Sequence, residues 1–180
     1  MQNGDQRTRR TRDAILGALT LLVFERRYDA IKTGDLIAAA GVGRSTFYEH
    51  FRSKDEVLIA AMEPILLPLA NAAVGRASYA YVRSALDHLW EQRAFARVIL
   101  NSAARTRIER GLAQLIEAKL EEGPTGAAPR AMIARAAAAA QLTMLTMWVG
   151  GEVACPIEGF TRQTMACSTF ARSSDASGVV

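Results

Sequence analysis

The chain has 180 residues, 50% of them hydrophobic and 22% charged, which is enough to bury a core in one or two small domains. The formal net charge of +4 is compatible with a nucleic-acid partner. The basic N-terminus lacks the apolar run of a signal peptide, and no stretch reaches about 18 uninterrupted apolar residues, so we expect a cytoplasmic protein without a membrane span. The sequence has no Cys/His cluster, no nucleophile–base spacing and no phosphate-binding glycine loop. This argues against a metal site, a cofactor and an enzyme.

The N-terminal segment carries a concentrated positive charge. We expect residues 1–8 to be disordered and a first helix to run from about Thr11 to Arg27, since apolar residues recur there at helical spacing. Alanine is frequent along the chain and β-branched runs are rare, which favours an all-α fold. The charge is either a solvated tail or a contact to DNA phosphates or the minor groove, and both alternatives stay open. Four arginines fall within six residues: Arg7, Arg9, Arg10 and Arg12.

The stretch DLIAAAGVGRSTFYEHFRSK, residues 35–54, predicts a helix, a tight turn and a second helix. The glycines of Gly41-Val42-Gly43 allow positive φ, and the valine can fill the angle between the helices. Phe47 and Phe51 lie four residues apart on one side of the second helix. A helix with aromatic anchors inward and polar groups outward suits the major groove of DNA. The polar groups are Arg44, Ser45, Thr46, Tyr48 and His50.

This segment, GVGRSTFYEHF followed by SKDEV, resembles the DNA-binding signature of the TetR family of bacterial transcriptional regulators. The resemblance covers roughly a fifth of the chain, and the remainder fits the family in length and helix content but not by motif. It implies an all-α protein with a helix-turn-helix DNA-binding domain at residues 1–55. A helical effector-binding and dimerisation domain is expected at residues 56–180. The strongest matches are AGV at 40–42, TFY at 46–48, HF at 50–51 and SK at 53–54.

Individual roles at the DNA follow from side-chain chemistry and from the resemblance. Arg44 can donate two hydrogen bonds to guanine, and Ser45 and Thr46 can reach base edges or thymine methyl groups. Lys32 stands where family members often carry a capping threonine, and Thr33 follows it. We expect Thr33 to cap the helix and Lys32 to contact phosphate. Three further residues resemble the family's backbone-contacting positions: Tyr48, His50 and Lys54.

The rest of the chain reads as helices joined by short connectors. Ser53 is a good N-cap for a helix that enters the second domain. Pro64 and Pro68 predict a kink there, or a break at which Pro64 starts a new helix, whereas the family resemblance implies an unbroken helix. Further helices are expected at about 78–93, 95–102, 105–122, 130–149 and 161–171, with a flexible linker at 123–129 and a connector at 156–160.

The resemblance also predicts an apolar effector pocket and a dimer interface, for which the alternative is plain helical core. The pocket candidates are Met62, Tyr81, Trp90, Phe95, Met144 and Trp148. Small residues on the last two helices would let a partner helix approach and form a four-helix bundle, unless this face is buried inside its own domain. The interface candidates are Ala134, Ala137, Gln141, Leu145, Met165 and Phe170.

Together these features predict a sequence-specific DNA-binding regulator. The resemblance implies a homodimeric repressor that a small-molecule effector releases from a palindromic operator. The alternative is a DNA-binding or protein-interaction adaptor of the same fold that has no effector. A helical enzyme tethered to nucleic acid is disfavoured by the lack of a catalytic constellation.

Overall fold

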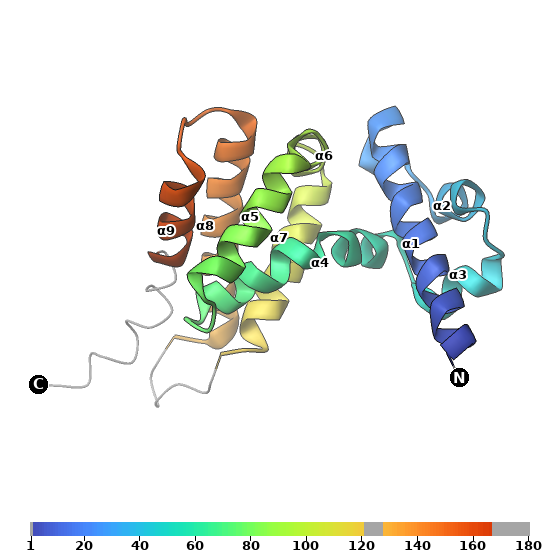
Figure 1. Cartoon of the computed structure of the whole chain (residues 1–180), viewed down its shortest axis with the longest axis horizontal. Helices are drawn as coiled ribbons and strands as arrows, with labels where there is room; N and C mark the ends of the chain where they lie inside the picture. The colour runs from blue at the N-terminus through green and yellow to red at the C-terminus, as the bar shows by residue number, and fades with distance from the viewer. Residues whose placement is uncertain (1, 121–127, 167–180) are drawn as a thin grey trace, which may run out of the picture.

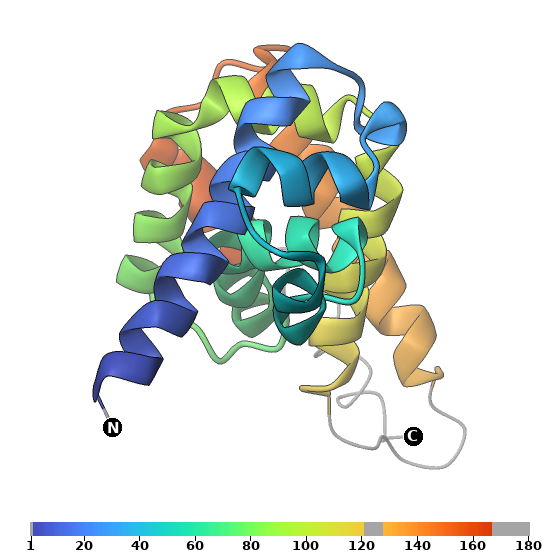
Figure 2. The same cartoon turned by 90° about the vertical axis from the view of Figure 1, so that its right-hand side faces the viewer.

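The computed structural model describes residues 2–120 and 128–166, and every regular element in these ranges is helical (Figure 1). The all-α expectation is therefore confirmed. The N-terminal elements form a head at one end of the molecule, and Figure 2 looks onto it with α1, α2 and α3 in front of the other helices. The head comprises α1 (Gln2–Glu25), the 3-10 turn η1 (Tyr28–Ala30), α2 (Thr33–Ala40) and α3 (Arg44–His50).

The remaining helices form the core domain, with α9 and α8 at the end farthest from the head (Figure 1). The expected last helix begins earlier than predicted, because residues 157–160 are helical rather than a connector. The predicted linker falls largely outside the described residues. The elements are α4 (Lys54–Ala73), α5 (Tyr79–Glu91), α6 (Arg93–Leu100), α7 (Ala104–Glu117), α8 (Arg130–Gly150) and α9 (Ile157–Ala166).

The first helix corrects the expectation of an N-terminal disordered segment. α1 starts at Gln2, so residues 2–8 are helical. From residue 6 onward its first buried side chain is Ile15, and the apolar face then continues through Leu19 to Val23. Once this packed part is helical, each further residue toward the N-terminus adds one hydrogen bond without a new nucleation step. Four of the five residues at 6–10 are arginine or glutamine, which are good helix formers and favour this extension.

The helix that joins the two domains is not broken by its prolines. α4 is a single helix that contains both Pro64 and Pro68, so a new helix does not start at Pro64. Ser53 caps it as expected, its hydroxyl accepting a hydrogen bond from the Glu56 N–H at 3.2 Å. An internal proline costs about 3 kcal/mol or more. Here half of the helix is buried against α1, α5 and α7, which offsets that cost.

Two helices, α4 and α8, are long and apolar enough to cross a membrane by composition alone. In each of them about half of the most apolar window is buried inside the chain, 56% in α4 and 44% in α8. The most extensive helix–helix contacts in the structure join α8 to α7 and α7 to α4. Their apolar character is therefore consistent with core helices.

Candidate nucleic-acid interface

Only one of the two glycines in the turn between α2 and α3 adopts a positive φ. Gly41 has φ 63° in the left-handed region and ends α2, its N–H donating to the carbonyls of Ala38 and Ile37. Gly43, in contrast, has φ −70° in the extended region, so the expected positive φ applies to Gly41 alone. Val42 packs against the core as expected. This geometry lets α3 leave the turn across α2.

Two phenylalanines anchor α3 to the head. Phe47 is fully buried and Phe51 is 3% exposed, with their ring centroids 6.2 Å apart. Tyr48 lies edge-on to Phe47 at 5.5 Å but keeps 46% of its surface exposed. The Arg44 guanidinium lies over the Tyr48 ring at 5.7 Å. The aromatic anchors thus face inward, and a basic, hydroxyl-rich surface faces solvent.

The structure places the predicted DNA-contacting residues of α3 on or beside this outward surface. Arg44, Ser45 and Tyr48 are exposed, whereas Thr46 and His50 are half-buried. Side chains on a helix held this way can enter a major groove without disturbing the packing beneath them. Their contacts to bases and phosphates stay predictions.

The start of α2 differs from the expectation for Thr33. Lys32 occupies the capping position, and Thr33 is the first residue of the helix. The Lys32 N–H donates to the Asp35 carboxylate at 2.7 Å, so the acid three residues on supplies the side-chain hydrogen bond. Lys32 itself is exposed, which leaves its amine available for phosphate.

Lys54 has an intramolecular role that the sequence did not indicate. Its amine donates to the carbonyl oxygens of Tyr28 at 2.8 Å and Ile31 at 2.7 Å, and lies 3.4 Å from that of Asp29. It also lies 4.5 Å from the centroid of the Tyr28 ring. The first residue of α4 therefore satisfies the carbonyl groups of the 3-10 turn in the head. The predicted phosphate contact of Lys54 would have to compete with these bonds.

A carboxylate next to Lys54 joins the head to the core domain. Asp55 accepts a hydrogen bond from the Tyr28 hydroxyl at 2.6 Å and another from the Arg107 guanidinium at 2.8 Å. Tyr28 is 2% exposed, and burial together with the bond to Asp55 raises the pKa of its hydroxyl far above the ordinary value. Arg107 belongs to α7, so one carboxylate bonds groups from η1 and α7. We call these three residues the junction triad.

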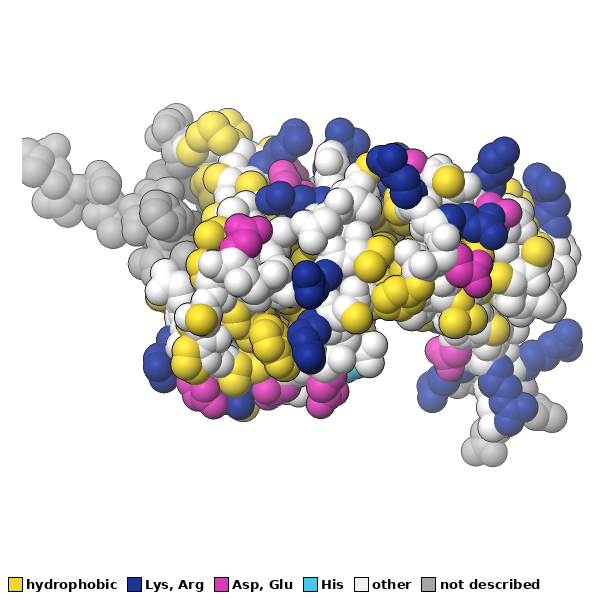
Figure 3. Space-filling model, turned by 90° about the horizontal axis from the view of Figure 1, so that it is seen from above, with side chains coloured by type: hydrophobic (Ala, Val, Ile, Leu, Met, Phe, Trp, Pro, Cys, Tyr) yellow, Lys and Arg dark blue, Asp and Glu magenta, His cyan; other side chains and the backbone are white. Residues whose placement is uncertain are grey.

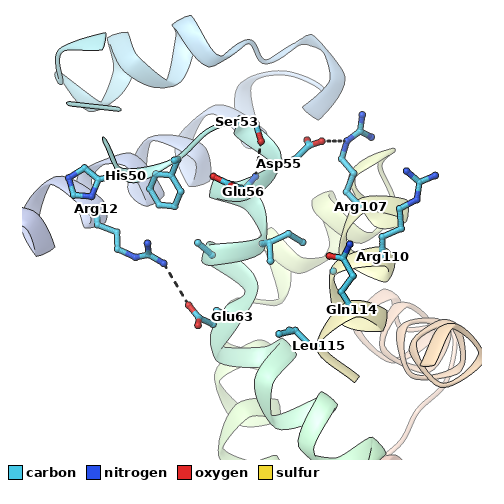
Figure 4. A pocket seen from close by; sticks show the side chains of 14 residues that line it. Arg12, His50, Ser53, Asp55, Glu56, Glu63, Arg107, Arg110, Gln114 and Leu115 are labelled. Atoms are coloured by element: carbon cyan, nitrogen blue, oxygen red, sulfur yellow. Dashed lines mark hydrogen bonds and ion pairs between the residues drawn. The ribbon is translucent and has the colours of Figure 1, made fainter. Parts of the chain in front are cut away.

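A cleft of about 560 Å³ opens between the head and α7 (Figure 4). Arg12 from α1 lies beside His50 of α3 and forms an ion pair of 3.7 Å with Glu63 of α4. Across the cleft, Arg110 and Gln114 of α7 line the opposite wall. The cleft therefore lies beside the C-terminal end of α3.

None of the predicted effector residues lines this cleft. Met62 is buried in α4, whereas the exposed fraction of Tyr81 is 45%. Phe95 contacts Phe24 of α1, with ring centroids 6.3 Å apart. Trp90 and Trp148 do meet, with ring centroids 4.7 Å apart, and Trp148 in turn stacks on Phe160 at 4.3 Å. Met144 is partly buried on α8.

The burial of the predicted dimer residues shows which face of α8 lies inward. Ala134, Gln141 and Leu145 are buried inside the chain, so this part of the interface prediction is wrong. The apolar stripe of α8 packs on its own domain, mainly against α7. Ala137 and Met165 are partly buried, and Phe170 lies outside the described residues. The face of α8 that remains exposed carries Met132, Ala136, Ala140 and Thr143, with Met147 partly buried.

Sequence reasoning missed the junction triad and the role of Arg12. Asp55 indicated only favourable charge at a helix start, since its partners lie 27 and 52 residues away along the chain. Arg12 appeared only as part of a basic run, whereas its guanidinium lies 5.0 Å from the centroid of the Phe51 ring. The regular spacing of apolar residues carries no signal for such long-range polar pairs.

Comparison with known proteins agrees with this geometry. The family model described as "Bacterial regulatory proteins, tetR family" matches residues 15–61, which span the head and the start of α4. The "HTH-type transcriptional repressor LfrR" of Mycolicibacterium smegmatis is 41% identical over 68 residues, which are 38% of this chain and 34% of that protein. The chain thus matches about a third of the length of that relative.

A solved structure shares the fold over nearly the whole chain. It is a TetR transcriptional regulator from Streptococcus agalactiae with a TM-score of 0.54 and 24% sequence identity, and the match covers 92% of this chain and 97% of that one. The identity is low, so this likeness concerns the fold, while the helix-turn-helix match carries the family assignment. Residues 15–61 therefore carry the N-terminal domain described by the tetR family of bacterial regulatory proteins, and the chain has the fold of a TetR regulator.

Proposed function

We propose that this protein is a homodimeric repressor of transcription that binds a palindromic operator and is released by a small-molecule effector. The observation that carries the DNA-binding part is α3, whose phenylalanines are buried while Arg44, Ser45 and Tyr48 are exposed. The relative named above is itself a transcriptional repressor, which supports the direction of regulation. Two such heads related by a two-fold axis would reach major grooves about 34–36 Å apart.

Selection from a random duplex library at physiological salt tests the DNA-binding part. We expect enrichment of a palindrome with half-sites about one helical turn apart. Arg44→Ala should then cost about 1–3 kcal/mol on the best site and relax the base preference at one position. Arg97→Ala, which removes an exposed arginine on α6, is the control for the loss of charge. No enriched sequence, or equal loss on all duplexes for Arg44→Ala, would contradict base readout.

The exposed face of α8 supports the dimer. Five residues recur along α8 at spacings of three or four and so share one side of the helix. They are Met132, Ala136, Ala140, Thr143 and Met147. Met132 is 59% exposed, and the small side chains beside it would let the backbone of a second copy approach closely. Two copies of α8 and α9 could then pack as a four-helix bundle.

An arginine at the centre of this face tests the dimer. Ala140→Arg should shift the protein from dimer to monomer in sedimentation equilibrium and weaken operator binding, because a charge cannot be buried unpaired. Ala80→Arg, at an exposed position of α5, is the matched control and should stay dimeric. If Ala140→Arg stays dimeric as well, this face is not the interface.

One buried amide supports the effector part. The Gln141 side chain is 3% exposed, and its amide nitrogen donates to the Leu69 carbonyl at 3.1 Å. Its oxygen Oε1 has no hydrogen-bond partner among the residues that the structure describes. A buried polar atom without a partner costs about 1–3 kcal/mol, which a ligand with one hydrogen-bond donor could relieve. Leu69 lies on α4, the helix that begins at the head, so a ligand here would act on the element that links the domains.

A phenol series tests the effector proposal, because a phenol joins an apolar ring to one donor. We expect at least one phenol to raise the melting temperature and to release the operator, with a coupling of about 1–3 kcal/mol. Gln141→Leu should retain operator binding and lose this response, whereas Gln114→Leu on the exposed side of α7 should keep it. If a phenol still releases the Gln141→Leu variant from the operator, this amide does not bind the effector. If no ligand releases the wild-type protein, the result favours the adaptor that has no effector.

A further inference from the structure

The N-terminal part of α1 is a basic helical segment that lacks a core of its own. Residues 6–10 are exposed, Thr11 and Arg12 are half-buried, and the first fully buried side chain is Ile15. Residues 6–14 contain four arginines and one acid, Asp13, a local charge of +4 − 1 = +3. Figure 3 shows dark blue side chains gathered on a projection from the head. We call residues 6–12 the basic segment.

The arginines of the basic segment are arranged so that they repel one another. Arg7 and Arg10 are three residues apart on the helix, as are Arg9 and Arg12, and like charges at this spacing destabilise a helix. Among the described residues, Arg12 finds a partner in Glu63, whereas Arg7, Arg9 and Arg10 make no ion pair with any described acid. A polyanion would relieve this repulsion.

The basic segment also begins beside the recognition helix. The Arg12 guanidinium lies over the ring of Phe51, the residue that ends α3, and shares a cleft with His50. From Arg12, α1 continues toward the N-terminus past α3, and a rise of 1.5 Å per residue puts Arg7 about 7–8 Å farther along the axis. The free arginines therefore project from the same end of the head as α3.

We infer that the basic segment is a second DNA-binding element, in which Arg7, Arg9 and Arg10 contact backbone phosphates next to those bound by the helix-turn-helix. Arg7 and Arg10 lie on one side of the helix and Arg9 on another, a spread that suits charge contacts to phosphates better than the directed geometry of base readout. The segment adds affinity that depends on salt and adds no sequence preference. This inference rests on the proposed DNA-binding function.

The test compares two variants that remove equal charge. Arg7→Gln/Arg9→Gln/Arg10→Gln neutralises the segment, and Arg97→Gln/Lys119→Gln/Arg130→Gln neutralises three positions of the core domain that do not line the cleft. Neither set includes a fully buried side chain, and circular dichroism checks that both proteins remain folded. Affinity for the selected operator and for a scrambled duplex is measured from 50 to 200 mM salt.

We expect the segment variant to lose affinity equally on both duplexes, with a slope of log K against log salt shallower by roughly 0.9 for each lost phosphate contact. Three contacts correspond to a difference of roughly 40-fold between the two salt concentrations. The control should retain the wild-type slope. Equal slopes for the two variants would overturn the inference. So would binding of the wild-type protein to anionic vesicles that the segment variant loses, if the two proteins bind DNA equally well. If the wild-type protein selects no operator at all, the proposed function fails instead.

Discussion

The head and the core domain of this protein differ in how well their polar groups are hydrogen-bonded. The head is closed by buried aromatic side chains, and the polar groups where it meets α4 are paired, since Lys54 and Asp55 bond its 3-10 turn. The core domain between α4 and α8 contains a buried amide with one unsatisfied oxygen. Satisfied polar networks make a region rigid, whereas an unsatisfied group is relieved by a change of state or a ligand. This difference fits the proposed readout of DNA by the head and the proposed regulation through the core domain.

The largest expected effect is loss of the aromatic anchor in the head. Phe47→Ala removes a fully buried ring and should lower the free energy of unfolding by about 3–5 kcal/mol. Tyr48→Ala, next to it but half-exposed, should cost far less stability while it weakens DNA binding. Urea denaturation followed by circular dichroism measures both variants. Similar losses for the two would mean that the inward and outward sides of α3 are not separated as described.

The junction triad should have the next largest effect. Asp55→Ala leaves the Tyr28 hydroxyl and Arg107 without their acceptor and should lower the free energy of unfolding by about 1–3 kcal/mol. The Asp55 side chain is 44% exposed, so solvent screening favours the lower part of that range. A double-mutant cycle with Arg107→Ala isolates the pair, and additive effects would show that the two domains are not coupled through it.

Removal of the buried amide in the core domain should raise stability, whereas the two preceding substitutions lower it. Gln141→Leu replaces the side chain by an apolar one of similar size and should raise the free energy of unfolding by about 1 kcal/mol. Thermal unfolding in the absence of ligand measures this change. A clear loss of stability would show that the bond from Gln141 to the Leu69 carbonyl outweighs the unsatisfied oxygen, and the contrast between the two interiors would disappear.

The last effect is absent at neutral pH and is a dependence of stability on alkaline pH that comes from Tyr28. Its pKa is raised in the folded protein by burial and by the bond to Asp55, whereas in the unfolded chain it is about 10. Above pH ~10 the unfolded chain loses this proton and the folded one keeps it, so stability falls by at most about 1.4 kcal/mol per pH unit. The stability difference between wild type and Tyr28→Phe should be constant at pH 7–9 and shrink above pH 10. A constant difference up to pH 11 would contradict the raised pKa.

Local sequence determined the head more completely than the core domain. The spacing of Phe47 and Phe51 and the glycine at position 41 specify a helix-turn-helix within about twenty residues, because turn chemistry and helical periodicity act over short distances. The same reasoning identified most core helices but not their faces. α8 is apolar around most of its circumference, so composition does not tell which side meets its own domain and which side is left for a partner.

By itself the sequence determined an all-α chain, the helix-turn-helix, the polar face of α3 and the basic run at the N-terminus, since each depends on neighbours along the chain. Only the tertiary structure decided that Gln141 is buried, that α4 continues through two prolines and that Asp55 joins Tyr28 to Arg107. These features depend on packing and hydrogen bonds between residues dozens of positions apart. Their free energies outweigh local preference, and no local pattern records them.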